Sequence, residues 1–226
     1  MSRFVLPPLY PIVDPGPPEA DPATPGGRRP RPGREPERLA AAILAGGAKI
    51  LQLRMKGGAG GWGAGAVLAA AKQLRRLTRD AGALFIVNDR ADVALIADAD
   101  GVHVGQEDLP YEEVRRLLGP GRLIGVSTHS VEEARAAEAA GADYIGFGPM
   151  FPTATKRDTR PVQTLERLQA VRAAVALPIA AIGGITAERI AAVRAAGADS
   201  VAVISAICDA ADPTAATRRL RQLAGG

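Results

Sequence analysis

The chain has 226 residues, of which 47% are hydrophobic and only 4% aromatic, so its core has to be built from aliphatic side chains. A single cysteine excludes an internal disulfide and a zinc site made of several cysteines, and two histidines leave little scope for a histidine-rich metal centre. The excess positive charge lies mainly in one arginine-rich segment rather than along helix faces with interleaved aromatics, which argues against nucleic acid as a partner. No apolar run reaches the ~20 residues of a membrane span, and the sequence predicts a soluble, cytoplasmic protein.

Eight short runs rich in Val, Ile and Leu recur along the chain and predict strands. In order they are PLYPIV (8–13), ILQL (50–53), LFIV (84–87), GVHV (101–104), LIGV (123–126), YIGFG (144–148), PIAAI (178–182) and SVAVI (200–204). Ala-rich segments with helical spacing lie between them, such as 132–140 and 187–196. Continuously apolar strands that alternate with helices are typical of a parallel sheet buried on both faces.

A weak internal repeat supports this prediction. The segments LAGGAKILQL, AAGADYIGFG and AAGADSVAVI share one layout, in which a helix ends, a Gly follows, and a strand begins. Eight such units in about 200–250 residues predict one (β/α)8 TIM barrel. An open doubly wound sheet is the alternative, and the lack of a GxGxxG motif after an early strand weakens it.

The segment from Asp14 to Glu37 interrupts the pattern. It is dense in Pro, Gly and Arg, and we expect it to form no regular element. Because it follows the first strand, it should emerge at the rim of the barrel that carries active sites. We interpret it as a solvated, mobile loop insertion, and the alternative is a lid whose arginines meet an anionic substrate.

Polar residues cluster just after the apolar runs, where barrel enzymes carry their active sites. They include Gln52, Arg54, Lys56, Asn88, Asp89, Asp108, Ser127, His129, Thr153, Thr155, Lys156 and Ser205, while Gly183 and Gly184 follow the seventh run. The starts of the same strands carry mostly Gly, Ala and Asp. This asymmetry favours an enzyme.

Three chemistries follow from these residues. Asp89 and Asp108 come after neighbouring strands, and two carboxylates completed by waters and phosphates are a usual magnesium site. Arg54, Lys56 and Lys156 would bring three positive charges to the same rim, which suits a diphosphate. The segments 182–186 and 203–207 follow the last two strands, where barrels often bind phosphate.

Each residue also has a plainer interpretation. Asp89 and Asp108 could cap the helices that follow them, Arg54 and Lys56 could be solvated charges, and Gly183–Gly184 could be a tight turn. His103 is more simply a hydrogen-bonded core residue, Cys208 is a small apolar one, and Tyr144 and Phe147 belong to strand packing. We assign no role to His129.

Seven blocks occur in order at the predicted strand ends. They are QLRMK (52–56), VNDR (87–90), GVHVGQEDL (101–109), GVSTHS (125–130), GADYIGFGPMFPTATKRDT (141–159), IGGI (182–185) and ISAI (204–207). Together they closely resemble the thiamine phosphate synthase family, and the resemblance runs from about Leu9 to the C-terminus apart from the insertion.

The resemblance implies a (β/α)8 transferase that joins a hydroxymethylpyrimidine diphosphate to a thiazole phosphate and releases diphosphate. It implies that Mg²⁺ is bound at Asp89 and Asp108. The positions that would hold the pyrimidine diphosphate are Gln52, Leu53, Arg54, Met55, Lys56, Asn88, Ser127 and Lys156. Those that would hold the thiazole phosphate are Thr153, Ala154, Thr155, Gly184, Ile204 and Ser205. Of these, Arg54, Lys56, Ser127 and Lys156 are the predicted catalytic residues.

Met55 departs from the family, which usually has Glu at this position. Its side chain should point away from Arg54 and Lys56, so we expect little effect on the chemistry. The alternatives left open are a thiazole tautomerase-like isomerase, a barrel that binds a phosphate ligand without catalysis, and a phosphosugar isomerase. Preference for a carboxylated thiazole and assembly into a homo-oligomer are also open.

Overall fold

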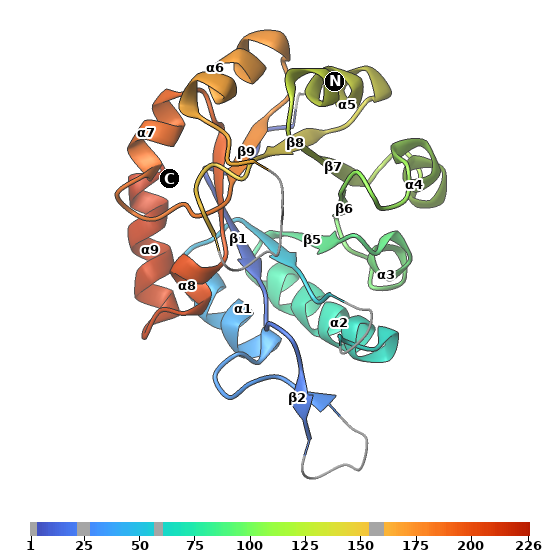
Figure 1. Cartoon of the computed structure of the whole chain (residues 1–226). Coiled ribbons are helices and arrows are strands. Elements are labelled where there is room, and N and C mark those ends of the chain that lie inside the picture. The colour runs from blue at the N-terminus through green and yellow to red at the C-terminus, as the bar shows by residue number, and fades with distance from the viewer. Residues whose placement is uncertain (1–3, 22–27, 57–60, 154–160) are drawn as a thin grey trace.

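The eight apolar runs form eight parallel strands that close into a barrel in the computed structural model (Figure 1). The structure describes residues 4–21, 28–56, 61–153 and 161–226. The strands of the barrel are β1 (Leu9–Val13), β4 (Ile50–Leu53), β5 (Leu84–Asn88), β6 (Gly101–Val104), β7 (Leu123–Thr128), β8 (Tyr144–Phe147), β9 (Ile179–Ile182) and β10 (Ser200–Val203). The predicted (β/α)8 barrel is therefore confirmed, and the open sheet is excluded because β1 pairs with both β4 and β10.

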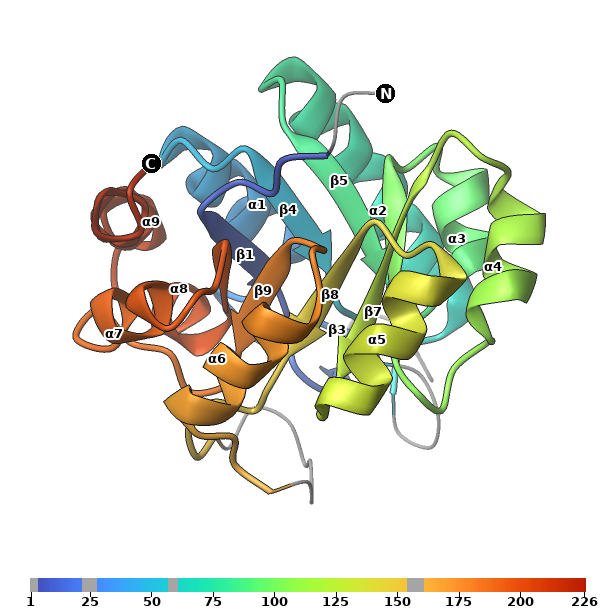
Figure 2. The same cartoon turned by 90° about the horizontal axis from the view of Figure 1, so that it is seen from above.

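Helices surround the barrel and alternate with its strands (Figures 1 and 2). They are α1 (Pro36–Ala45), α2 (Ala64–Asp80), α3 (Ala91–Ile96), α4 (Tyr111–Leu118), α5 (Val131–Ala140), α6 (Leu165–Ala174), α7 (Ile190–Ala195), α8 (Ser205–Cys208) and α9 (Pro213–Leu223). Local signals set several helix ends. Ser130 caps α5 by accepting a hydrogen bond from the Glu133 amide at 3.1 Å, and Gly141 ends the same helix with a φ of 94°. None of the helices in the described ranges is both long and apolar enough to cross a bilayer.

The core is aliphatic and continuous, as the composition predicts. Strands β4, β8 and β10 are buried along their whole length, because the barrel interior covers one face of the sheet and the helices cover the other. Four of the eight aromatic residues lie deep inside, with Tyr10, Phe85, Tyr144 and Phe147 at most 1% exposed.

Three Arg–Asp pairs with the same arrangement lie at the pole of the barrel where the strands begin. In each, the aspartate just before a strand accepts a backbone N–H of the neighbouring strand and an arginine from a helix. The groups are Arg75, Asp100 and the Phe85 amide; Arg115, Asp143 and the Ile124 amide; and Arg172, Asp199 and the Ile179 amide. Each group ties two adjacent strands to one outer helix.

The insertion is more regular than we expected. Glu19–Ala20 (β2) pairs antiparallel with Arg28–Arg29 (β3), and the last two residues of the segment, Pro36 and Glu37, open helix α1. The prediction of no regular element was wrong because the four paired residues are not prolines and have amides to donate, while Pro36 occupies the first helical turn, which tolerates it. The hairpin projects from the barrel beside α1 and α2 (Figure 1).

Candidate active site

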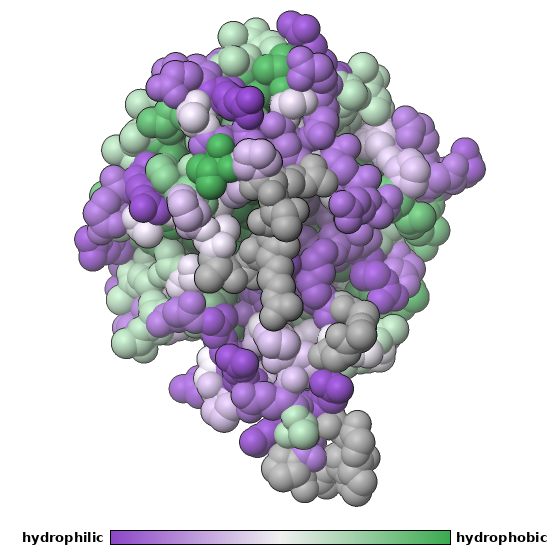
Figure 3. All heavy atoms as spheres, viewed as in Figure 1, coloured by the Kyte–Doolittle hydropathy of each residue, from purple (hydrophilic) through white to green (hydrophobic). Residues whose placement is uncertain are grey.

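The carboxyl ends of the barrel strands meet at one pole, and the predicted site residues lie there. Figure 2 shows this pole at the bottom, with β3 and the segments that follow the strands, and the C-terminus at the opposite pole. Figure 3 looks onto the same pole, where hydrophilic residues dominate the surface around the centre. The position matches that of active sites in barrel enzymes.

Lys56, Asp89 and Asp108 form a charged cluster at this mouth. The Lys56 ammonium donates a hydrogen bond to the Asp89 carboxylate, and the Asp108 carboxyl lies within hydrogen-bonding reach of Asp89. Burial raises the pKa of Asp89; Lys56 lowers it, and the neighbouring Asp108 adds to the increase. Two carboxyl groups that follow different strands therefore converge, as the sequence predicts.

The backbone at Asp89 is held in a rare conformation. Its φ is 63°, and the Arg90 amide donates to the Asn88 carbonyl at 2.8 Å, so Asp89 is the middle residue of a tight γ-turn with positive φ. The Asp89 amide is tied to the His103 carbonyl across the sheet at 2.8 Å. Such strain persists where the surroundings enforce it, and it commonly marks a functional position.

Neither aspartate caps a helix, so that plainer interpretation was wrong. The residues at the cap positions of α3 and α4 are Arg90 and Pro110, and neither helix has a side-chain cap. Asp108 instead accepts the Gly105 amide at 2.7 Å, which folds the loop after β6 back on itself.

Arg54 is paired rather than open at the rim. Its guanidinium donates to the Asp14 carboxylate, and the two side chains are only 11% and 8% exposed. A buried cation needs a counter-charge, which Asp14 supplies, so the plainer interpretation of Arg54 as a solvated charge was wrong. Asp14 was missed as a site residue, although it is the first polar residue after the first apolar run and the same strand-end rule would have selected it.

Asp14 also anchors the insertion to the barrel. Its other carboxylate oxygen accepts the Gly16 amide at 2.8 Å, and its carbonyl accepts a hydrogen bond from Arg34 at 2.8 Å. Trp62 donates to the Gly16 carbonyl at 2.9 Å. Both ends of the insertion are therefore bonded to the rim beside Arg54.

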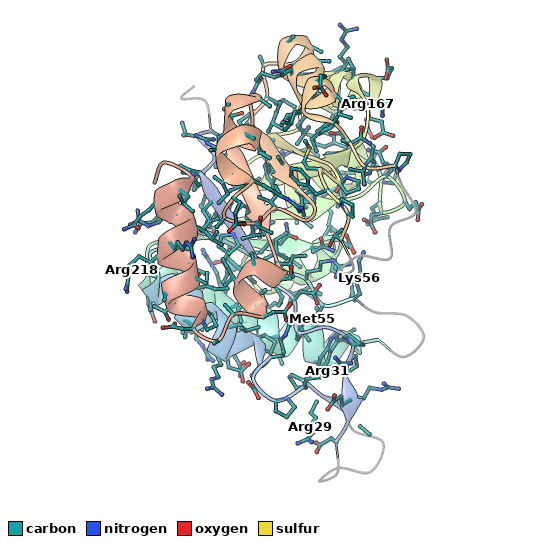
Figure 4. The ribbon with its side chains drawn as sticks, turned by 60° about the vertical axis from the view of Figure 1, so that its left-hand side comes forward. Arg29, Arg31, Met55, Lys56, Arg167 and Arg218 are labelled. Carbon is teal, nitrogen blue, oxygen red and sulfur yellow. The ribbon has the colours of Figure 1, made fainter. Side chains whose placement is uncertain are left out.

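The QLRMK block presents alternate side chains in different directions. Gln52 lies inside the barrel and donates to the Tyr10 hydroxyl at 3.0 Å, so the predicted partner of this buried amide is present. Leu53 and Met55 are buried in the hydrophobic core, and only their backbone could face a ligand. Figure 4 shows Met55 and Lys56 between the barrel and the hairpin that carries Arg29 and Arg31. Asn88 ends β5, and Ser127 lies near the end of β7.

A pocket after β9 and β10 collects four of the residues predicted to bind the thiazole phosphate: Thr153, Gly184, Ile204 and Ser205. Gly183 and Gly184 have φ values of 103° and 60°, and a Cβ on Gly184 would come within 2.6 Å of the Pro152 carbonyl oxygen. The two glycines thus let the loop after β8 pack on the loop after β9, which is more than an ordinary turn requires. Ala154, Thr155 and Lys156 lie outside the described residues.

The remaining candidates have simple roles. His129 donates through Nδ1–H to the Gly148 carbonyl at 2.6 Å, which orients the loop after β7. Cys208 is buried, as predicted for a small apolar residue. Across the ranges that the structure describes, no three His, Cys, Asp or Glu side chains come together as a metal site.

Comparisons with known proteins agree with this geometry. The family model described as thiamine monophosphate synthase matches residues 25–207. Thiamine-phosphate synthases of Moorella thermoacetica and Methanoculleus marisnigri are 51% and 53% identical; the alignments cover 84% of this chain in both cases, and 89% and 88% of the relatives. The solved thiamine phosphate pyrophosphorylase of Pyrococcus furiosus superimposes with a TM-score of 0.80 at 38% identity, covering 96% of this chain and 95% of that one.

The family match spans most of the chain and includes every strand of the barrel except β1. The alignments with the two synthases also cover most of the length of those relatives. The chain therefore belongs to the thiamine monophosphate synthase family of transferases.

Proposed function

We propose that the chain is a thiamine-phosphate synthase that couples a hydroxymethylpyrimidine diphosphate with a thiazole phosphate, in carboxylated or decarboxylated form, and releases diphosphate. The observation that carries the proposal is the cluster of Lys56, Asp89 and Asp108 at the mouth of the barrel. A departing diphosphate gains negative charge, and preorganised positive charge is commonly the largest catalytic contribution.

The carboxylate pair fits Mg²⁺ on chemical grounds. Asp89 and Asp108 adjoin each other, and oxygen ligands from one or two carboxylates, waters and substrate phosphates are what Mg²⁺ prefers. The shortage of further acidic ligands among the described residues suits an ion that is shared with a substrate. When bound, Mg²⁺ would neutralise negative charge on the diphosphate.

The chain's own residues would do the rest. Lys56 and Lys156 would offset charge on the diphosphate, and Arg54, fixed by Asp14, would bind it with two N–H groups. Gln52 and Ser127 would hold the pyrimidine. An amino-substituted ring stabilises a pyrimidinylmethyl cation, so the diphosphate can leave before the thiazole nitrogen attacks, and no general base is required.

The thiazole phosphate would occupy the pocket after β9 and β10. Thr153 and Ser205 supply hydroxyl groups there, and Gly184 lets backbone approach the ligand closely. The pocket and the charged cluster lie at the same pole, so both substrates could be held together.

The insertion fits a surface loop better than a lid. Arg31 pairs with Glu19 inside the hairpin at 3.2 Å, and Arg34 is bonded to Asp14 and Asp209. These arginines already have partners, which supports the interpretation of residues 14–37 as an insertion into a single barrel domain.

The test is a coupling assay with both substrates and Mg²⁺, with released diphosphate and the joined product as separate readouts. Equal amounts of both, dependent on each substrate, are expected. Isomerised thiazole without diphosphate would support the tautomerase alternative, and binding without turnover would support a non-catalytic barrel. Either result would refute the proposal.

Asp89→Asn tests the metal assignment, since Asn tolerates positive φ but carries no charge. We expect a loss of about a hundredfold or more in kcat, and loss of the rise in melting temperature that Mg²⁺ with substrate gives the parent protein. Asp92→Asn is the matched control, because Asp92 is more than half exposed and pairs with Arg90. Unchanged Mg²⁺ dependence in Asp89→Asn would contradict the assignment.

A further inference from the structure

An unbroken chain of hydrogen bonds crosses the interior of the barrel. Gln52 donates to the Tyr10 hydroxyl at 3.0 Å, and the Tyr10 and Tyr144 hydroxyls lie 2.8 Å apart. His103 Nδ1 is 3.2 Å from the Tyr144 hydroxyl, and His103 Nε2 is 2.9 Å from Ser127 Oγ. The five residues come from five different strands, β4, β1, β8, β6 and β7.

Two glycines leave room for the side chains of this hydrogen-bonded chain. A Cβ on Gly125 would lie 2.1 Å from the Tyr144 ring, and one on Gly146 would lie 2.9 Å from the His103 ring. Tyr10 and Tyr144 are buried, and burial raises the pKa of both phenols, so they keep their protons at neutral pH. Both hydroxyls therefore remain donors as well as acceptors.

We infer that Tyr10, Tyr144 and His103 are positioning residues that couple the Gln52 amide to the Ser127 hydroxyl across the barrel. The inference rests on the proposed function in one respect, namely that Gln52 and Ser127 hold the pyrimidine. It adds that these two groups do not orient independently.

The direction of the chain follows from counting protons. The Gln52 amide nitrogen only donates, so Tyr10, which has one proton, donates to Tyr144, and Tyr144 donates to His103 Nδ1. Neutral His103 then carries its proton on Nε2 and donates to Ser127 Oγ. Ser127 is left with its own proton to donate to a ligand.

If the Gln52 amide turns over, every bond in the chain reverses. Tyr10 then donates to the amide oxygen, His103 carries its proton on Nδ1, and Ser127 donates inward and offers lone pairs to a ligand. One end therefore sets whether the other is a donor or an acceptor. A ligand with both a donor and an acceptor on one edge, such as an aminopyrimidine, would be selected by the chain as a unit.

The kinetic test is a double-mutant cycle on Gln52→Ala and Ser127→Ala, run in the parent protein and again in Tyr144→Phe. The KM for the pyrimidine diphosphate and kcat are measured for each. In the parent, we expect the effect of the double variant on kcat/KM to differ from the product of the two single effects by about five- to tenfold. In Tyr144→Phe, where the chain of hydrogen bonds is interrupted, the difference should be less than about twofold. Additive effects in the parent, or the same coupling in Tyr144→Phe, would overturn the inference.

Tyr111→Phe is the matched control. The chain has three tyrosines, and the Tyr111 hydroxyl lies outside the barrel, where it donates to the Gly141 carbonyl at 2.6 Å. The variants Tyr10→Phe, Tyr111→Phe and Tyr144→Phe all keep the aromatic ring, and their melting temperatures show whether they fold. Tyr111→Phe should leave the Gln52–Ser127 coupling unchanged.

A second test does not depend on turnover. The chain has only two histidines, so ¹⁵N NMR resolves the His103 tautomer with His129→Asn as the assignment variant. We expect a single tautomer in the parent and a mixture of the two in Tyr10→Phe. A mixture in the parent, or no change in Tyr10→Phe, would overturn the inference even if the coupling assay showed no synthase activity.

Discussion

Single residues at the mouth of the barrel are held by charges that compensate one another. Arg54 and Asp14 are both nearly buried, and Lys56 opposes the two adjoining carboxyl groups. The diphosphate substrate that we propose would need cations at the site, and cations that are out of water need acids nearby. Asp14 therefore matters because it keeps Arg54 in place until a substrate arrives.

Removing Asp14 should destabilise the protein strongly. Asp14→Ala leaves the Arg54 charge buried without its partner, which costs about 3 kcal/mol in the free energy of unfolding, measured by denaturant titration. Asp14→Asn keeps an oxygen for the Gly16 amide and should lose less. Glu113→Ala breaks the exposed pair with Arg116 and should cost less than about 0.5 kcal/mol. Equal losses for Asp14→Ala and Glu113→Ala would contradict this account.

Much of the site could be predicted from residue positions, and the partners of those residues could not. Asp89 and Asp108 converge because parallel strands end at one pole, which follows from the strand pattern alone. The need of Gln52 for a partner was also predictable, but Tyr10 meets it only because β1 closes the barrel against β4. Pairings such as Arg54 with Asp14 likewise depend on closure, which local periodicity does not encode.

At the scale of the elements, the same Arg–Asp group recurs at the strand pairs β5–β6, β7–β8 and β9–β10. Asp100, Asp143 and Asp199 each tie a helix arginine to the preceding strand of the barrel, and the residue two positions before each has positive φ. The sequence repeat that predicted the barrel contains Asp143 and Asp199. In the fourth pair, β1 with β4, the corresponding residue is Lys49, whose register partner across the two strands is Leu9.

The other parts of this fourth group are present. Gly47 has a φ of 91°, and a Cβ there would lie 3.2 Å from Arg221 Nε, much as Gly197 abuts Arg172 in the group of Asp199. Among the described residues, Arg221 Nε is buried without a hydrogen-bond partner. The position of Lys49 thus has an arginine beside it and lacks the acid.

Lys49→Asp should complete the fourth group and stabilise the barrel. The new carboxylate would accept hydrogen bonds from Arg221 and from the Leu9 amide, for a gain of about 1 kcal/mol in the free energy of unfolding. Thermal unfolding of Lys49→Asp is compared with that of Lys49→Ala, which only removes the lysine. Adding Arg221→Ala should abolish the gain. If both variants at position 49 unfold at the same temperature, the parallel between the groups does not hold.

At the scale of the whole molecule, the two poles have different tasks. Arg–Asp groups close the pole where strands begin, and compensated charges with a strained Asp89 line the pole where they end. The interior between them is largely apolar, and the chain of hydrogen bonds from Gln52 to Ser127 crosses it. That interior also sets a limit on the stability of the whole fold at high pH.

The buried phenols of Tyr10 and Tyr144 should make the protein unfold at alkaline pH. Burial raises the pKa of both, so the folded state retains protons that the unfolded state loses above about pH 10. Their contribution to stability is fully present below that pH and is lost as the pH rises toward the folded values, with a slope of about 1.4 kcal/mol per pH unit for each tyrosine.

Denaturant unfolding measured across this range, with phenolate absorbance followed in parallel, checks the slope. The double variant Tyr10→Phe with Tyr144→Phe should show a flatter decline than the parent, and each single variant should lie between them. In the parent, the phenolate signal of these two residues should appear only as the protein unfolds. If both phenols ionised while the protein stayed folded, water would have to reach the two buried tyrosine hydroxyls, and the hydrogen bonds between them could not exist as described.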